Sequence, residues 1–356
     1  MKLSYRILLS VFVVFIIGIF FWAAFSPKED LSVKIQRTLK EQEKVADLTF
    51  KDVSFEEVLG GIKYWQLNAV SALINKSTGV AALRQSNGNF FKSGKATLRF
   101  LSPAAVWDMK KKQILLDQPF GYDINLQAKV DQLMKQTDGF QGSFFNLPQL
   151  FGQTESYWFK AKNLSWSLAD EKLTCTGGII LKKGEVTGLA KKLTGDVALE
   201  HVWLTGAPII TIALEDDTII TIEADSFQID TPNNLITAHG SPVIHWGEAI
   251  ITAGKLQYQQ DKNMLRLDDQ VKIDYNDIRG WGKSGEYFTK SQTIVLTGKA
   301  RAIQGDNSLT GEKISVSLGD KKISVAGRGK VVITENDLPN GKKEQNDDNN
   351  TGQTEN

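Results

Sequence analysis

Four segments of the chain repeat one another: NNLITAHGSPVI from Asn233, NMLRLDDQVKID from Asn263, QTIVLTGKARAI from Gln292 and KKISVAGRGKVV from Lys321. The leading apolar residue of each segment follows the previous one by 30, 29 and 29 positions. These residues are Leu235, Leu265, Ile294 and Ile323. A fixed period of this length is typical of a repeat protein, in which each unit buries its apolar face against its neighbours.

A second column of small residues has the same period of 29 positions and opens strand-like runs; its members are Ala224, Ala253, Gly282 and Gly311. Within each run apolar and polar residues alternate, as in KLQYQ from Lys255. Alternation with a period of two places all the apolar side chains on one face of a strand. Each unit is therefore predicted to be two strands joined by a polar turn. The pattern weakens towards the N-terminus.

The predicted fold class is all-β, an elongated β-jelly-roll or stack of antiparallel strand repeats, with one N-terminal transmembrane helix. The apolar faces close on each other as a sandwich, a jelly roll or a flattened solenoid. Residues 123–156 interrupt the rhythm: VDQLMKQ is compatible with a short helix, and SFFNLPQLFG with an irregular apolar loop.

The alternation defines a column of residues that points inward. In one interpretation this column is simply the core; in the other it lines an open apolar groove, and periodicity alone does not separate the two. The candidate groove-lining residues are Leu256, Tyr258, Leu265, Leu267, Val271, Ile273, Ile294, Leu296, Ile323, Val325 and Val331.

An apolar run from Ile7 to Phe25 precedes all of this, interrupted only by Ser10 and Gly18. Nineteen residues of helix span roughly 28 Å, close to the roughly 30 Å hydrocarbon core of a bilayer. Basic residues precede the run, which predicts a cytoplasmic N-terminus at residues 1–6 and a body outside the cytoplasm. The alternative is a cleaved signal peptide, but the run is long for one and the nearest cleavage pattern would place Pro27 directly after the cut.

Residues 26–45 are charged and only loosely helical in spacing, so they are interpreted as a spacer between the membrane and the body. Residues 335–356 contain almost no apolar side chain, so burial cannot offset their ordering entropy and disorder is predicted.

Several classes of function are excluded. The net charge of +1 argues against nucleic-acid binding. The single cysteine, Cys175, is interpreted as a small buried hydrophobe. The three histidines, His201, His239 and His245, lack zinc spacing, and no catalytic or nucleotide-binding motif is present. We therefore expect no enzyme, no catalytic residues, no metal and no cofactor.

Taken together, these features resemble the lipopolysaccharide-transport bridge proteins, of LptC-like and OstA/LptA-like type. LGGIKYWQLNAVSALI from Leu59 is similar to the opening strands of LptC-like domains, and LTGKARAIQGDNSLTGEKISVSLGDKKISVAGRGKVVI from Leu296 to the OstA repeat. The chain is longer than a compact LptC. The resemblance implies an LptC-like portion at residues 46–200 followed by an OstA-like portion at residues 201–334.

The resemblance also implies a function: an inner-membrane-anchored periplasmic component of lipopolysaccharide export that shelters acyl chains in an apolar groove. The implied partners are lipopolysaccharide, the permeases of an inner-membrane ABC transporter, and a periplasmic OstA/LptA-like bridge protein or outer-membrane translocon joined by β-strand addition. The alternative is a non-transporting envelope scaffold or adhesive β-solenoid. The sequence leaves open which lipid is carried, whether there are one or two jelly rolls, the oligomeric state, and whether a separate soluble bridge is needed.

Overall fold

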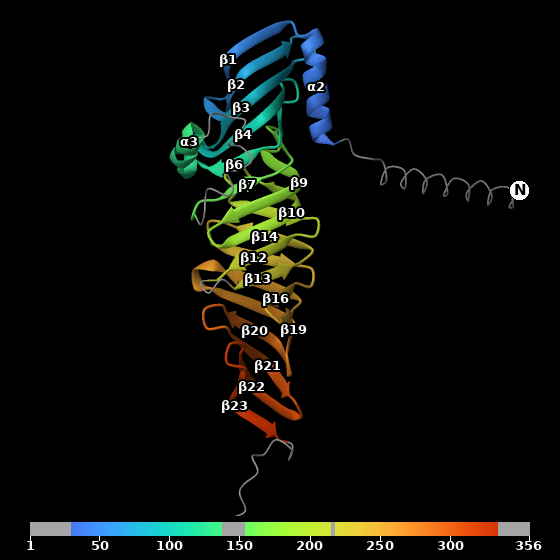
Figure 1. The fold of residues 1–356 in the computed structure, drawn as a ribbon, viewed down its shortest axis with the longest axis vertical. Helices are drawn as coiled ribbons and strands as arrows, with labels where there is room; N and C mark the ends of the chain where they lie inside the picture. The colour runs from blue at the N-terminus through green and yellow to red at the C-terminus, as the bar shows by residue number, and fades with distance from the viewer. Residues whose placement is uncertain (1–29, 137–153, 215–217, 334–356) are drawn as a thin grey trace, which may run out of the picture. The chain divides into compact units, whose positions relative to one another are not determined.

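The computed structural model describes residues 30–136, 154–214 and 218–333 (Figure 1). Apart from short helices, these residues form antiparallel β-structure, which confirms the predicted all-β class. The chain divides into two compact units, Met1–Pro208 (unit 1) and Ile209–Asn356 (unit 2). The predicted anchor, apolar loop and C-terminal tail fall outside the described residues. No helix within the described ranges is long and apolar enough to cross a membrane.

Unit 1 contains eleven strands among its described residues. Their bounds are β1 Leu48–Leu59, β2 Ile62–Asn75, β3 Val80–Lys92, β4 Lys95–Asp108, β5 Gln113–Asp117, β6 Phe120–Asp123, β7 Trp158–Lys160, β8 Asn163–Ser167, β9 Lys172–Lys183, β10 Val186–Gly195 and β11 His201–Thr205.

The sheet of unit 1 folds into two halves, and each long strand contributes its first part to one half and its second part to the other. The first part of β4 pairs with β6, and its second part pairs with β5. Large aromatic side chains fill the space between the halves. The distance between ring centroids is 5.6 Å for Phe90 and Trp166 and 5.0 Å for Trp65 and Trp107.

Helix α2, Leu31–Val45, packs on the outer face of β2 to β5. The side chain of Asp30 caps it by accepting a hydrogen bond from the backbone N–H of Ser32 at 3.0 Å. Ile35 and Leu39, one turn apart, are buried against the sheet. The structure therefore differs from the predicted spacer, because these residues are part of the folded body.

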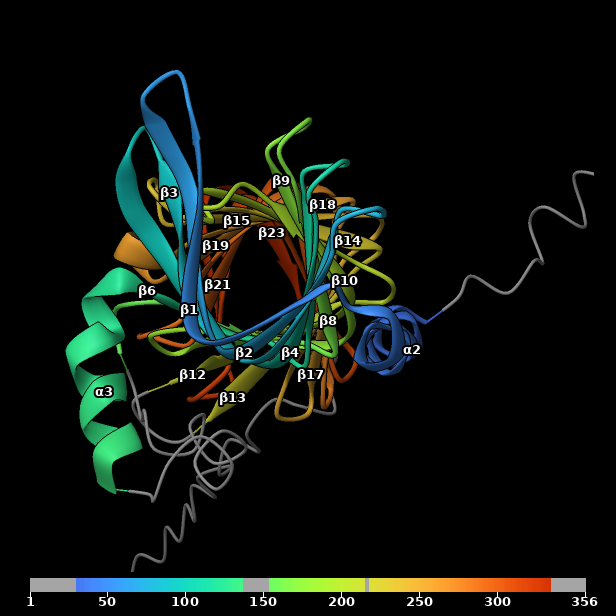
Figure 2. The same ribbon diagram turned by 90° about the horizontal axis from the view of Figure 1, so that it is seen from above.

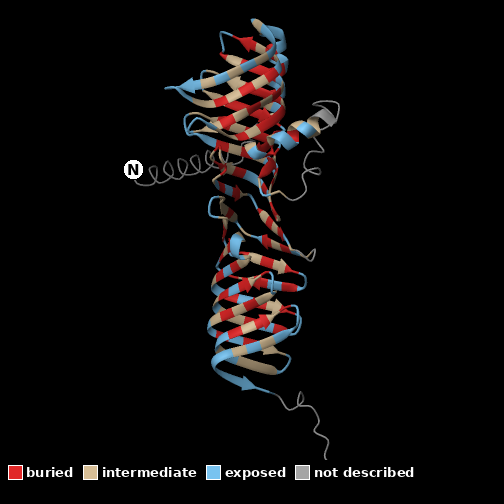
Figure 3. Ribbon diagram, turned by 90° about the vertical axis from the view of Figure 1, so that its left-hand side faces the viewer, coloured by how far each residue is buried: buried red, intermediate tan, exposed pale blue. Residues whose placement is uncertain are grey.

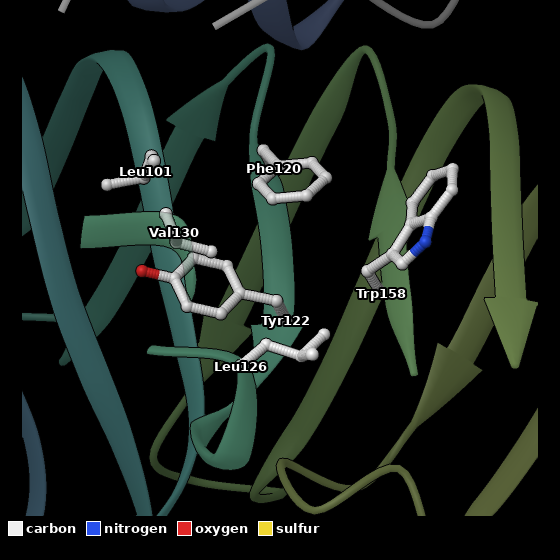
Figure 4. Packing of buried hydrophobic residues seen from close by; sticks show 6 residues of the cluster. All are labelled: Leu101, Phe120, Tyr122, Leu126, Val130 and Trp158. Atoms are coloured by element: carbon white, nitrogen blue, oxygen red, sulfur yellow. The ribbon is translucent and has the colours of Figure 1, made fainter. Parts of the chain in front are cut away.

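A second helix, α3, Gln127–Gln136, confirms the short helix predicted in this region. It follows the 3-10 turn η1, Ile124–Leu126, and lies on the opposite side of unit 1 from α2 (Figure 2). Val130 packs on Phe120, Tyr122 and Trp158 of β6 and β7 (Figure 4). Each helix thus covers an outer face of the sheet that is itself apolar.

Unit 2 is a regular succession of hairpins. Its strands are β12 Ile209–Ala213, β13 Ile219–Glu223, β14 Ser226–Asp230, β15 Leu235–His239, β16 Val243–Trp246, β17 Ala249–Thr252, β18 Lys255–Gln259, β19 Met264–Tyr275, β20 Ile278–Phe288, β21 Thr293–Gln304, β22 Asn307–Ser317 and β23 Lys322–Val332. A 3-10 turn, η2 Gln260–Lys262, joins β18 to β19.

A pair of left-handed residues marks the point in each repeat where the strand bends from one half of the sheet to the other. We call these corner pairs; they are Gly177–Gly178, Gly206–Ala207, Gly240–Ser241, Asp269–Gln270 and Gly298–Lys299, with Gly327 at the next equivalent position. In the ladders of β19 to β23 each pair is a β-bulge, since it opposes a single residue of the neighbouring strand. From Gly240 onward the 29-residue period is therefore the distance from one corner to the next.

The first residue of a corner pair packs tightly against the preceding strand. A Cβ atom at Gly298 would lie 2.7 Å from the Cβ atom of Lys283, closer than side chains tolerate. Asp269 is the exception at this position, and the residue opposite it is Gly254, where a Cβ atom would lie 2.8 Å from the Cβ atom of Asp269. Each corner thus has at least one glycine, and in this repeat the glycine stands on the opposing strand.

Candidate functional site

Ten of the eleven inward residues predicted from the sequence fall in three rows across unit 2, and the other, Val271, directly follows a corner pair. Row one runs through Tyr258, Leu265, Tyr287, Ile294, Val316 and Ile323, each paired with the next. Row two runs through Leu256, Leu267, Gly285, Leu296, Ile314 and Val325. Row three, beyond the corner pairs, runs through Ile251, Ile273, Gly280, Ala302, Leu309 and Val331.

Burial changes along these rows. The eight predicted residues from Leu256 to Leu296 are buried, with at most 1% of each exposed. On the last strand, β23, Ile323 and Val325 are only partly buried, and Val331 is 55% exposed. Val331 thus lies in register with the inward row but is exposed, because no strand in the described part of the chain covers the far side of β23 (Figure 3).

The two halves of unit 2 touch inside this column. A Cβ atom at Gly280 of row three would lie 2.9 Å from the Cδ1 atom of Leu296 and 3.5 Å from that of Ile273. At Gly285 of row two, a Cβ atom would lie 3.4 Å from both Leu296 and Val271. Two glycines on β20 therefore let the leucine of one half reach the other half. In this structure the rows are closed against each other.

The outward faces of the same strands are polar and charged. On β19, Arg266 forms an ion pair with Asp268 at 3.2 Å, and Lys272 with Asp274 at 3.9 Å. These side chains are largely exposed, so the pairs contribute little to stability. The contrast between an apolar inward face and a charged outward face fixes the register of each strand. A slip of one residue would turn the charged side chains inward and bury them.

The edge strand β23 pairs through its ladder with β22. Val331, Val332 and Ile333 at its end are each about half exposed, at 55%, 46% and 57%. A strand edge with unpaired N–H and C=O groups beside exposed apolar side chains is a template for adding another strand. All three rows end on this strand.

Sequence reasoning missed several members of the rows, namely Ile251, Tyr287, Ala302, Leu309, Ile314 and Val316. Their signal was available in the alternation of the strands that became β17, β20, β21 and β22. It also missed the interior of unit 1, where Trp65, Phe100 and Phe159 are buried. Those aromatic strands alternate as well, but without the repeat that marked unit 2.

The three histidines are not brought into one site. His201 is exposed on β11 of unit 1, whereas His239 and His245 lie partly buried on β15 and β16 of unit 2. Within the described ranges no group of three or more His, Cys, Asp or Glu side chains could hold a metal ion. Cys175 is fully buried on β9, and burial raises the pKa of its thiol.

Residues 221–322 match the family model described as LptA/(LptD N-terminal domain) LPS transport protein. This stretch contains most of the three rows. Residues 221–322 are therefore similar to the LptA and LptD N-terminal domains of lipopolysaccharide transport. The resemblance noted in the sequence is confirmed for this part of the chain.

Two curated relatives agree with that assignment. The lipopolysaccharide export system protein LptH of Pseudomonas aeruginosa is 26% identical over 120 residues, covering 31% of this chain and 68% of the relative. The corresponding protein LptA of Escherichia coli K12 is 26% identical over 139 residues, covering 36% of this chain and 75% of the relative. The prediction of a non-enzymatic protein agrees with these names, which describe export-system proteins.

A crystal structure of LptH from P. aeruginosa, described as the LptA-homologous periplasmic component of the lipopolysaccharide transport device, covers 32% of this chain and 94% of its own. It is 21% identical in sequence, with a TM-score of 0.30, which is too low to define a shared arrangement.

Proposed function

We propose that this chain is a periplasmic component of lipopolysaccharide export and that its three rows shelter the acyl chains of the lipid. The observation that carries this proposal is the continuity of the rows. Rows one and two cross every strand from β18 to β23, row three passes from β17 to β19 and on to β23, and all three end at an exposed apolar edge. The names of the matched relatives, which are export-system proteins, support the same function.

The physical need for shelter is large. Each methylene of an acyl chain costs about 0.8 kcal/mol when it is exposed to water. Aliphatic and aromatic side chains line the rows, while the charged outward faces of the same strands leave the sugars of the lipid in water. The repeat allows the apolar shelter to be lengthened, since each added unit extends all three rows.

The rows are closed on themselves, so a lipid enters only when the two halves of unit 2 separate. We propose that an acyl chain displaces Leu296 from its place against Gly280 and lies between the halves. The contact at that point is made by side-chain atoms of a leucine over a glycine. Opening exposes apolar side chains of both halves, and the acyl chain then covers them, which limits the cost of separation.

The open edge of β23 is proposed as the docking surface for the next bridge component, either an OstA/LptA-like protein or the outer-membrane translocon. Strand addition there would pair the free backbone groups and cover Val331 and Ile333. We further propose that residues 7–25 anchor the chain in the inner membrane, that residues 46–200 act as an LptC-like base contacting the permeases of an ABC transporter, and that the transporter supplies the energy.

The test is photo-crosslinking in cells that make lipopolysaccharide. A photoreactive amino acid at Leu267 or Leu296 is expected to capture lipopolysaccharide. The matched control is Val295, which neighbours Leu296 on β21 and points to the opposite face, where its ladder partners are Glu286 and Ser315. Capture at Val295 as strong as at Leu296, or at neither, would reject sheltering and favour a non-transporting scaffold.

A second experiment separates the transport function from the scaffold. Depletion of the protein is expected to sensitise the outer membrane to large hydrophobic antibiotics and to trap lipopolysaccharide at the inner membrane. Normal lipopolysaccharide delivery after depletion would contradict the proposal.

A further inference from the structure

Unit 1 has a cleft of about 620 Å³ that the rows of unit 2 do not explain. Its lining comes from the start of β2, the β3–β4 hairpin, the β8–β9 turn and the segment from β10 to β11. The residues are Ile62, Tyr64, Phe91, Lys92, Ser93, Asp170, Glu171, Lys172, Thr194, Gly195, Asp196, Val197, His201 and Trp203. Its volume lies in the range of sites that bind small molecules.

Aromatic side chains line this cleft from both sides. Trp203 stands on β11 with 42% of its surface exposed, next to Thr194 of β10. Tyr64 and Phe91, both partly buried, come from β2 and β3. An indole ring kept accessible to water beside two further aromatic rings offers flat apolar faces within a polar setting.

One wall of the cleft is held in place by specific contacts. The ammonium group of Lys92 lies 2.5 Å from the carboxylate of Glu200 and 3.9 Å from that of Asp196. The same Asp196 carboxylate accepts hydrogen bonds from the backbone N–H groups of Ala198 at 2.8 Å and Glu200 at 3.2 Å. In addition, the hydroxyl of Thr97 donates to the carbonyl of Val197 at 3.2 Å. The loop between β10 and β11 is therefore fastened to the β3–β4 hairpin.

The polar groups of the cleft are mixed in sign. Lys92 is paired with Glu200 and Asp196, and the exposed polar lining also includes Lys172 as a donor, Asp170 and Glu171 as acceptors, and the side chains of Ser93 and His201. Because side chains of both charges line the cleft, it favours neither a highly charged anion nor a highly charged cation. A ligand with many hydroxyl groups suits it, because each hydroxyl both donates and accepts, while the C–H faces of a sugar ring pack on aromatic rings.

We infer that this cleft is a saccharide-binding site, with Trp203 as the stacking platform. Two sources offer that chemistry: the sugar portion of a lipopolysaccharide and the glycan of the cell wall. The inference rests on the proposed function only for the first source. The site is separate from the acyl-chain rows and needs no lipid.

The experiment uses the full chain in a detergent without a sugar headgroup, since a maltoside would itself occupy the site. The probes are an acyl-free core oligosaccharide from deacylated lipopolysaccharide and a disaccharide fragment of peptidoglycan, followed by saturation-transfer NMR. The variants are Trp203→Ala and Lys172→Ala, both at exposed positions that leave the fold intact. The control is Trp281→Ala on β20, a partly buried tryptophan in the other unit.

At least one saccharide is expected to bind the unmodified chain and the Trp281→Ala control equally. Binding should weaken about tenfold in Trp203→Ala and less in Lys172→Ala. The probe that binds identifies the source. If neither saccharide binds, or if Trp203→Ala binds as well as the unmodified chain, the inference fails and a peptide becomes the better occupant. Lipid crosslinking at Leu267 is independent of this result, so the two proposals fail separately.

Discussion

Unit 1 and unit 2 are built from the same antiparallel ladders, yet they treat their outward faces differently. In unit 1 the outer face of β2 to β5 carries Ala82, Ala104 and Val106, and α2 covers it. The outer face of β4, β6 and β7 carries Phe120 and Tyr122, and α3 covers it. In unit 2 the outward faces are charged, and η2 is the only helical turn among its described residues.

The difference shows what limits each unit. A sheet that is apolar on both faces needs an added layer, so unit 1 cannot be extended without another helix. Unit 2 buries one face and solvates the other, so its repeats need only a next strand to continue. In this protein the regular strand repeats of unit 2 have a polar outer face, whereas the less regular sheet of unit 1 has an apolar outer face that helices cover.

The largest effect is expected from the removal of an outward-facing side chain of unit 1. Phe120→Ala should destabilise unit 1 by about 3–5 kcal/mol, because the side chain is fully buried under α3. Cys175, the only cysteine of the chain, is buried in unit 1, so its rate of thiol labelling in denaturant reports the opening of that unit.

The control for this prediction is Val295→Ala on the outward face of unit 2, which should cost at most about 1.6 kcal/mol for the two methyl groups removed. Equal losses in the two variants would remove the distinction between the outward faces.

A smaller effect is expected from the corner pairs. Gly298→Ala should destabilise unit 2 by about 1–2 kcal/mol for the left-handed backbone alone, at φ +77°, with a further cost for the approach to Lys283. Chemical denaturation followed by the indole N–H NMR signals of Trp246 and Trp281, the tryptophans of unit 2, measures the loss. Unchanged stability would mean that the corner is not constrained as the structure indicates.

The corner at Asp269, where the glycine is Gly254 on the opposing strand, allows a double-mutant cycle. Gly254→Lys alone should be strongly destabilising because a Cβ atom there meets Asp269. Adding Asp269→Gly restores the arrangement seen at Gly298 and Lys283 and should recover most of the loss. Additive effects in the cycle would show that the two positions are independent.

An effect of comparable size concerns the docking of α2. Buried Asp117 accepts hydrogen bonds from the hydroxyl of Ser32 at 2.6 Å and from the side-chain amide of Gln36 at 2.9 Å. Gln36→Ala should weaken docking by about 1.5–3 kcal/mol, because a bond to a charged acceptor is lost. Limited proteolysis within α2 should accelerate, whereas Arg37→Ala, on the exposed side of the helix, should leave it unchanged.

The smallest effect is a pH dependence at the start of α2. The hydrogen bond from Lys162, and then that from the backbone N–H of Ser32, lower the pKa of Asp30 below its usual 3.8. A lowered folded-state pKa contributes stability above the usual value and loses it as pH falls through the folded one. Protease protection of α2 should therefore fall slightly below pH 4, and Asp30→Asn should abolish that step. A pH response that persists in Asp30→Asn would assign it to another group.

The sequence by itself determined the strands of unit 2, their 29-residue period and which side chains face inward. Local alternation carries that information, because the side chains of a strand point to opposite faces in turn. It also indicated the short helix that became α3. The glycines at 177, 206, 240, 298 and 327 were visible too, but their meaning as corners was not, since a left-handed backbone leaves no mark in the alternation.

Only the tertiary structure decided what each face meets. Ile35 and Leu39 look like scattered apolar residues of a spacer until Asp117 and the apolar outer face of β2 to β5 are brought beside them. Likewise, Val331 shares the inward pattern of Ile273, but it is exposed because it stands on the last strand of its ladder. The physical reason is the same in both cases: periodicity assigns a side chain to a face, whereas burial depends on whether a distant segment covers that face.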